Sequence, residues 1–507
     1  MPEKILPDLT PRHEDIDIMR EGLEKPWLLP NLAYEYSKKH YSGAVLPPYE
    51  HLSLPMTDAQ LNKRWAGLVA QDKEKRTRQL TGQLAPQQKN STFQSPLGKS
   101  LSEIMRPKSK VRGSVVFIHH AYYHFYHLAS ALRDRGWNAW CVSTEDPKSG
   151  NAPYYHGEDL NLWHDDFNVR LELQRELFHV VSQYFDMIHF HGDARFSIFD
   201  GLLCSNSERD GIGWDFLELK ARGVKIGHSM SGCLTGQRKS VFNIVSSGVC
   251  DKCVWQNRPD VCSEAAQFHS GERIKLICDL NALEVDWPGD TSRHTENCFY
   301  DPLTYCFSER LWRPDIKIPD HIERFAHKPG EVLVFHAVGN IKDRQTQTRS
   351  LKGTPAILAA IERLREEGHK VKLIFKTGVP SKDMRFYQIQ ADIIVDQINY
   401  GRYGATARET MALGIPTICR LNPEQPNGVK PSLALNECPL VDASEETVYE
   451  VLKDLVLNPE KREQIAKEGR AYAMKWHSSA ACAKRFERVY DRMMAGQYPL
   501  DVDEIYE

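Results

Sequence analysis

The sequence lacks the features that mark membrane-spanning, secreted and nucleic-acid-binding proteins. No apolar run among its 507 residues is long enough to cross a bilayer, and residues 1–22 hold no apolar core of a secretory signal. The formal net charge is -3, whereas general nucleic-acid binders are usually clearly basic. No repeat of solenoid length is present. We therefore expect a cytoplasmic protein with no transmembrane segment and no nucleic-acid partner; peripheral contact with a membrane stays open.

Length and composition indicate a globular protein of two or three domains. The chain is too long for one ordinary core, and its hydrophobic content is 41% with 26% charged residues. Residues 1–110 differ from the rest, since prolines interrupt them and the stretch KEKRTRQLTGQLAPQQ has little apolar period. They are predicted to be an N-terminal extension, partly disordered.

From residue 113 onward, strand-like and helix-like segments alternate. Apolar runs such as GSVVFIHH, NAWCVST and EVLVFHAVG are separated by amphipathic stretches that end in glycine. This alternation predicts an α/β fold with parallel sheets. We expect two facing Rossmann-like domains, at 111–325 and 326–476, followed by a helix and tail at 477–507. Ligands of such sheets bind beyond the carboxyl ends of the strands, here between the domains.

Residues 391–416 carry the most informative pattern, a buried strand, a glycine-rich loop and a helix with one acidic residue. Gly401 and Gly404 permit positive φ and close approach of a ligand. Backbone N–H groups at the helix start can bind phosphate, and Glu409 can accept hydrogen bonds from the two hydroxyls of a ribose. The alternative is that Glu409 only stabilises the helix dipole.

A basic stretch, KDRQTQTRSLKGT at residues 342–354, follows the strand EVLVFHAVG and leads into a helix. It brings Arg344, Arg349 and Lys352 to the same predicted sheet edge, and Lys376 ends the next strand. Fixed cations there would stabilise the charge that builds on a departing diphosphate. The alternative is a solvated basic loop.

The second half resembles the nucleotide-binding domain of the large GT-B glycosyltransferase family, the retaining "glycosyl transferases group 1" type that includes many polysaccharide and lipopolysaccharide enzymes. The matching segments are RSLKGTPAILAAIERL, ADIIVDQINYGRYGATARETMALGIPTI and KRFERVYDRM; the first half matches more loosely, through GSVVFIHH, FDMIHFHGD and DFLELKARGVKIGHS. The resemblance implies that Glu409 binds ribose, that Lys352 and Arg349 contact the diphosphate with Arg344 as rival, and that His228 lies beside the donor sugar.

One departure from the family pattern concerns the sugar side of the site. Many members carry an earlier glutamate that touches the transferred sugar, and here that position is Gly401, with Asp396 the nearest acid upstream. Histidines could supply polar groups on the sugar side, because imidazole can relay a proton near neutral pH. The residues expected at or near carboxyl ends of strands are His191, His228, His119, His120, His189 and Asp193. His120, His124 and His127 also share the spacing of one helix face, which predicts either a metal site or a packed helix start.

Four cysteines, Cys233, Cys250, Cys253 and Cys262, lie within a predicted insertion at 232–286. The C-x2-C pair can bind zinc, and a four-cysteine set would be structural; the alternative is four reduced thiols.

Together these features predict a glycosyltransferase that moves a hexose-type sugar from a nucleotide-diphosphate donor to a glycan or lipid-linked acceptor. No cofactor is required for catalysis. Two other interpretations stay open: a catalytically inactive GT-B protein that uses the cysteine-rich module for partner contact, and a zinc hydrolase built on the first-domain histidines.

Overall fold

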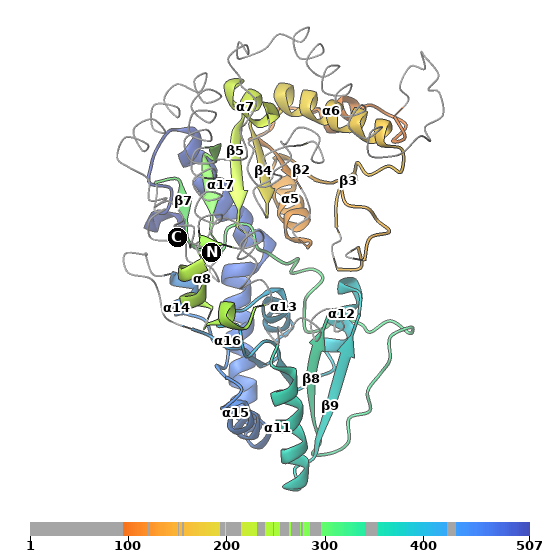
Figure 1. Cartoon of the computed structure of the whole chain (residues 1–507), viewed down its shortest axis with the longest axis vertical. Helices are drawn as coiled ribbons and strands as arrows, with labels where there is room; N and C mark the ends of the chain where they lie inside the picture. Colours follow the sequence, from red (N-terminus) through yellow and green to blue (C-terminus); the bar gives the residue numbers. More distant parts are fainter. Residues whose placement is uncertain are drawn as a thin grey trace, which may run out of the picture.

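The computed structural model describes residues 95–118, 122–150, 152–154, 157–192, 198, 214–230, 239–246, 248–253, 263–264, 274, 277–283, 296–339, 352–422 and 432–507. They form two parallel sheets in separate halves of the molecule (Figure 1). The predicted fold class, α/β with two Rossmann-like parallel sheets, is confirmed. None of the helices in these ranges combines the length and apolar character that a membrane span needs.

The first sheet has seven parallel strands in the order β3-β2-β1-β4-β5-β6-β7. The chain builds outward from β1 to β3, returns to place β4 on the other side of β1, and continues to β7. Strand order therefore reverses between β1 and β4, which is where ligands of such sheets bind. The strands are β1 (Ser114–Ile118), β2 (Asn138–Ser143), β3 (Leu160–Asn161), β4 (Met187–His191), β5 (Lys225–Ser229), β6 (Leu280–Ala282) and β7 (Cys298–Phe299).

Helices cover both faces of this sheet, because the central strands are apolar on both sides. Val116 and Ile118 pack on one face with α6, and Val115 and Phe117 pack on the other with α5. The helices of this half are α4 (Leu101–Met105), α5 (His124–Asp134), α6 (Phe167–Tyr184), α7 (Trp214–Ala221) and α8 (Lys239–Val245), with the 3-10 turn η2 (Val249–Lys252). The strand β6 lies inside the predicted insertion, which therefore contributes to the sheet.

The second sheet has four parallel strands in the order β11-β10-β8-β9. Its order reverses between β8 and β10, which gives a second switch point. Its strands are β8 (Val332–Val338), β9 (Val371–Thr377), β10 (Ile393–Val395) and β11 (Thr417–Ile418); its helices are α11 (Thr354–Glu366), α12 (Ser381–Gln388), α13 (Ala405–Ala412), α14 (Leu433–Asn436), α15 (Val448–Leu457) and α16 (Pro459–His477).

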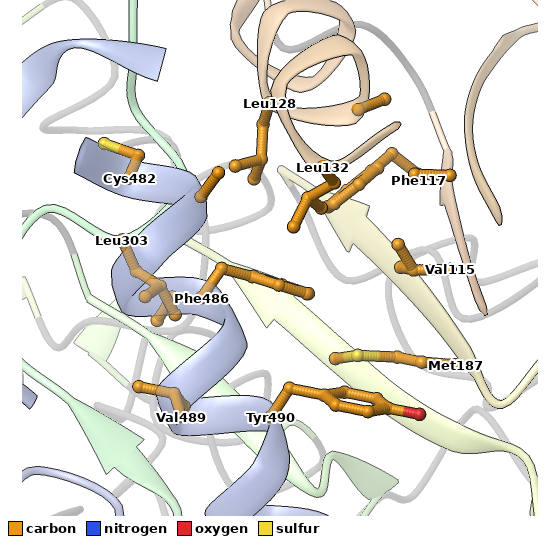
Figure 2. Close-up of a cluster of buried hydrophobic side chains, with 14 of the residues drawn as sticks. Val115, Phe117, Leu128, Leu132, Met187, Leu303, Cys482, Phe486, Val489 and Tyr490 are labelled. Carbon is orange, nitrogen blue, oxygen red and sulfur yellow. The ribbon is translucent and has the colours of Figure 1, made fainter. Parts of the chain in front are cut away.

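The last long helix, α17 (Ser479–Met494), returns to the first half of the molecule and is followed by the turn η4 (Asp503–Ile505). Its residues Phe486 and Val489 are fully buried against β1, β4 and α5 (Figure 2). The carboxylate of Glu487 accepts hydrogen bonds from Arg135 and from the Trp137 indole at 2.8 Å. The final helix is thus part of the core of the first sheet.

Candidate functional site

The carboxylate of Glu409 is buried where the two halves of the molecule meet. Glu409 lies on α13, which begins after Gly404, and only 5% of its surface is exposed. The Tyr123 hydroxyl, from the connection between β1 and α5, donates a hydrogen bond to Oε1. Gln388, at the end of α12, donates from Nε2 to Oε2 at 3.3 Å. Both oxygens therefore have a partner, and one partner comes from the first half.

Burial raises the pKa of the Glu409 carboxyl to about 7. The hydrogen bonds from Tyr123 and Gln388 oppose this rise, the negative charge of Asp396 adds to it, and the positive charge of Lys352 opposes it. Glu409 thus titrates near neutral pH and lies within electrostatic reach of both Lys352 and Asp396. The charges of Lys352 and Asp396 both act on the Glu409 carboxyl, and the shared site predicted for Lys352 and Glu409 stays a prediction.

Lys352 and Asp396 form an ion pair at the carboxyl ends of β8 and β10. The Asp396 side chain is 1% exposed and that of Lys352 is 14% exposed. Oδ2 of Asp396 is buried and accepts no hydrogen bond within the part of the chain that the structure describes. Separating the two would leave the buried Asp396 charge without a compensating partner, which costs free energy. The ion pair therefore keeps the Lys352 ammonium next to Asp396.

Gly353 positions Lys352 at the start of α11. Its φ is +67°, and an added Cβ would overlap the Ile398 side chain in the loop after β10. Only glycine allows this left-handed conformation and this close approach together. The connection carrying Lys352 is thereby packed onto the connection that leads to α13.

His336, on β8, ties these segments to one another. Its Nδ1 lies 2.8 Å from the Val395 carbonyl oxygen, and its Nε2 lies 2.8 Å from the Thr354 hydroxyl at the start of α11. Burial, together with the charge of Lys352, lowers the pKa of His336 to about 4, against the opposing effect of the hydrogen bond to the Val395 carbonyl. His336 is therefore a neutral structural group next to the site.

Both switch points meet here. Tyr123 follows β1, the strand at which the first sheet reverses, while Lys352 follows β8 and Asp396 follows β10, the strands at which the second sheet reverses. Sheets of this class bind ligands at such points. Glu409, Lys352, Asp396 and Tyr123 therefore form the candidate site.

The predicted glycines and Lys376 are placed as follows. Gly401 has φ +70° and takes the left-handed conformation that glycine permits, whereas Gly404 is extended at φ -116°. An added Cβ on Gly404 would meet no atom within 4 Å, so space next to the backbone is open there. Lys376 pairs with Glu323 at 2.5 Å and lies over the Tyr387 ring. This places the Lys376 ammonium on the linker between the sheets.

The first-domain histidines form an interior network. His228 is fully buried, with Nδ1 2.9 Å from the Asn281 side-chain oxygen and Nε2 3.1 Å from the Gly192 carbonyl oxygen. Burial lowers the pKa of His189 well below its usual range, and its Nε2 lies 2.8 Å from the Ser229 hydroxyl. The role of His228 beside a donor sugar stays a prediction.

Several predicted residues lie outside the described residues. They are Arg344, Arg349, Cys233, Cys262, His119, His120 and Asp193. Two members of the cysteine set are described, of which Cys250 is buried and Cys253 is partly exposed. Within the described ranges no group of three or more His, Cys, Asp or Glu residues is placed to hold a metal ion. The zinc hypothesis therefore gains no support.

Sequence reasoning missed Tyr123 and Gln388 as partners of Glu409. Tyr123 lies in the aromatic run HAYYHFYH, which was interpreted only as a packed helix start or a metal site. Its position directly after the first strand is the signal that could have singled it out, because that position faces the cleft.

No family model and no curated protein matches the sequence. Among solved structures, sucrose-phosphate synthase from Thermosynechococcus elongatus is 14% identical, with a TM-score of 0.44 over 76% of this chain and 100% of that one. HepE from Anabaena, in complex with UDP-glucose, is 10% identical, with a TM-score of 0.43 over 75% and 100%. UDP-N-acetylglucosamine 2-epimerase from Rickettsia bellii is 13% identical, with a TM-score of 0.39 over 76% and 98%. Because these likenesses are distant, the chemistry of this chain has to be derived from its own residues.

Proposed function

We propose that the chain is a glycosyltransferase that takes its sugar from a nucleotide-diphosphate donor bound between the two sheets. The observation that carries this proposal is the buried Glu409 carboxylate, within electrostatic reach of Lys352, at the joint switch point of both sheets. A carboxylate can accept both vicinal hydroxyls of a ribose, and an ammonium can bind a diphosphate. A nucleotide diphosphate carries the partner of each group, the vicinal hydroxyls of its ribose and the negative charges of its phosphates.

The Lys352 ammonium and the N-terminal N–H groups of α11 and α13 would hold the diphosphate. Arg349 and Arg344 belong to the same connection after β8 in the sequence and are proposed as further cations. As the bond between the anomeric carbon and the diphosphate oxygen breaks, these charges stabilise the leaving anion. The oxygen of an acceptor hydroxyl forms the new bond to the anomeric carbon, and its proton passes to the departing diphosphate.

The finer features of the proposal concern the sugar and the acceptor. We propose a hexose-type sugar, a glycan or lipid-linked acceptor, and His228 on the sugar side. Closing the two halves around the donor would exclude water and align the acceptor hydroxyl with the anomeric carbon. This exclusion matters because water would otherwise hydrolyse the donor.

The test is incubation of the protein with UDP-, GDP- and ADP-sugars, with and without candidate acceptors, and measurement of released nucleoside diphosphate. Glu409→Gln is expected to raise the donor KM at least tenfold, because a ribose hydroxyl loses a charged acceptor. Glu367→Gln is the matched control, since Glu367 also accepts a tyrosine hydroxyl but lies at the far end of α11. Equal kinetics of the Glu409 variant and the wild type would remove Glu409 from the site.

A non-catalytic binding protein gives a different result in the same assay. Nucleotide would then raise the melting temperature, in a Glu409-dependent manner, while no donor in the panel released nucleoside diphosphate.

A further inference from the structure

Both carboxylate oxygens of Glu409 accept a hydrogen bond from another residue of the protein. Oε1 accepts the Tyr123 hydroxyl and Oε2 accepts the Gln388 amide. With 5% of the residue exposed, a ribose cannot reach both oxygens without moving one of these partners. Gln388 belongs to the same half as Glu409. Tyr123 follows a strand of the first sheet, but its ring packs in the hydrophobic cluster of the second sheet, so its hydroxyl can leave Glu409 only if the halves separate.

The backbone just before Tyr123 has an unusual conformation. The preceding residue, Tyr122, has φ +66° and is the one described non-glycine residue with a positive φ. This conformation is unfavourable for a bulky side chain and persists only where surrounding contacts hold it. The Tyr123 ring is buried, 2% exposed, with its centroid 4.9 Å from that of Trp312.

Tyr123 is chemically suited to stand in for a ribose hydroxyl. Burial and the neighbouring Glu409 charge raise the pKa of Tyr123 well above its usual range, so the hydroxyl keeps its proton and acts as a donor. A ribose hydroxyl would present the same O–H donor to the same carboxylate oxygen.

We propose that Tyr123 occupies the ribose position on Glu409 and thereby sets the affinity for the donor. This inference rests on the proposed function of Glu409 and adds a residue of the first half to the donor site. Nucleotide binding then exchanges one hydroxyl for another, and it requires the halves to separate. The hydrogen bond from the Ser381 amide to the Pro153 carbonyl oxygen, at 3.0 Å, also joins the halves and would break in the same movement.

The experiment compares wild type with Tyr123→Phe by calorimetric titration of UDP, GDP and ADP at about pH 8.5, where Glu409 is ionised. Phenylalanine keeps the ring packing against Trp312 and removes only the hydroxyl. We expect the variant to bind nucleotide about tenfold more tightly, because the competing charged hydrogen bond is gone. The donor KM should fall by a similar factor, with a smaller change in kcat.

Tyr449→Phe is the matched control, because the Tyr449 hydroxyl also donates to a glutamate, Glu367, roughly 20 Å along α11 from the site. Its nucleotide affinity should equal that of the wild type. Small-angle scattering of the nucleotide-free protein provides a second readout, in which Tyr123→Phe should be more expanded than the wild type.

Two results would overturn the proposal in distinguishable ways. Unchanged or weaker binding by Tyr123→Phe, while Glu409→Gln still weakens binding in the wild type, rejects the exchange and keeps Glu409 as the ribose acceptor. Wild-type binding that is absent or independent of Glu409 rejects the proposed function, and the exchange with it.

Discussion

The ionisation of Glu409 leads to a prediction about pH. Its pKa lies at about 7, so about one tenth of the protein carries the carboxylate at pH 6 and about nine tenths carry it at pH 8. Only the ionised form can accept two ribose hydroxyls. Donor affinity should therefore rise by nearly tenfold between these two pH values.

Stability should change in the opposite direction over the same range. The carboxyl titrates at 4.5 when unfolded and at about 7 when folded. Between these values the folded protein holds a proton that the unfolded chain has released, so the free energy of unfolding falls as pH rises. The full shift corresponds to about 3 kcal/mol. Glu409→Gln should remove this dependence and be the more stable protein at pH 8.

The assay titrates an intact nucleotide-diphosphate sugar, whose diphosphate stays fully ionised across the range, and follows urea unfolding in parallel. Charged groups that face Glu409 are Lys352, Asp396 and Arg385, with Tyr123 from the first half. Glu409→Gln is the control, because every titratable group other than residue 409 is the same in both proteins. If both proteins show the same slopes of affinity and stability with pH, the reasoning about Glu409 is refuted.

Three further predictions concern the elements that hold the site in place. Gly353→Ala should destabilise the protein by about 3 kcal/mol in urea unfolding, because alanine is strained at a positive φ and its Cβ would overlap Ile398. The control Gly368→Ala should cost only about 1 kcal/mol, because φ is +87° there but no atom lies within 4 Å of the added Cβ. Lys352→Met should cost about 3 kcal/mol by leaving Asp396 unpaired, and adding Asp396→Asn should restore stability in thermal melting but not nucleotide binding. Phe486→Ala should cost about 3–5 kcal/mol in urea unfolding, because its ring is fully buried against the first sheet; a loss below 1 kcal/mol would contradict that packing.

The elements of the fold could be predicted because local patterns determine them. The predicted strand runs GSVVFIHH and EVLVFHAVG contain β1 and β8, most of whose residues are buried, and the helices predicted after residues 342–354 and within 477–507 correspond to α11 and α17. Strands β6 and β7 were missed, since segments of three and two residues carry no period to detect. Long-range placement was missed as well: nothing local shows that α17 packs against the first sheet.

The site was predictable only where its residues belong to one segment. Glu409 follows from its own loop and helix, and Lys352 from the connection before α11. The pair with Asp396 joins residues 44 positions apart, and the contact with Tyr123 joins residues 286 positions apart. Such contacts depend on how the sheets are packed, which a pattern of single residues does not contain.

Because of this packing, both halves contribute residues to the candidate site. The chain crosses between them twice, at the linker after Cys306 and at the junction of α16 and α17, and the two crossings are joined by backbone hydrogen bonds of 2.9 Å between Phe307 and residues His477 and Ser479. Because α17 is buried in the first core while α16 packs on α13, any rotation of the halves must bend this one pair of crossings. Tyr123 follows a strand of the first sheet and Glu409 lies on α13 of the second half, so the hydrogen bond between them joins the two halves. Under the proposed exchange, donor binding and domain movement would be coupled through the replacement of one hydroxyl group by another.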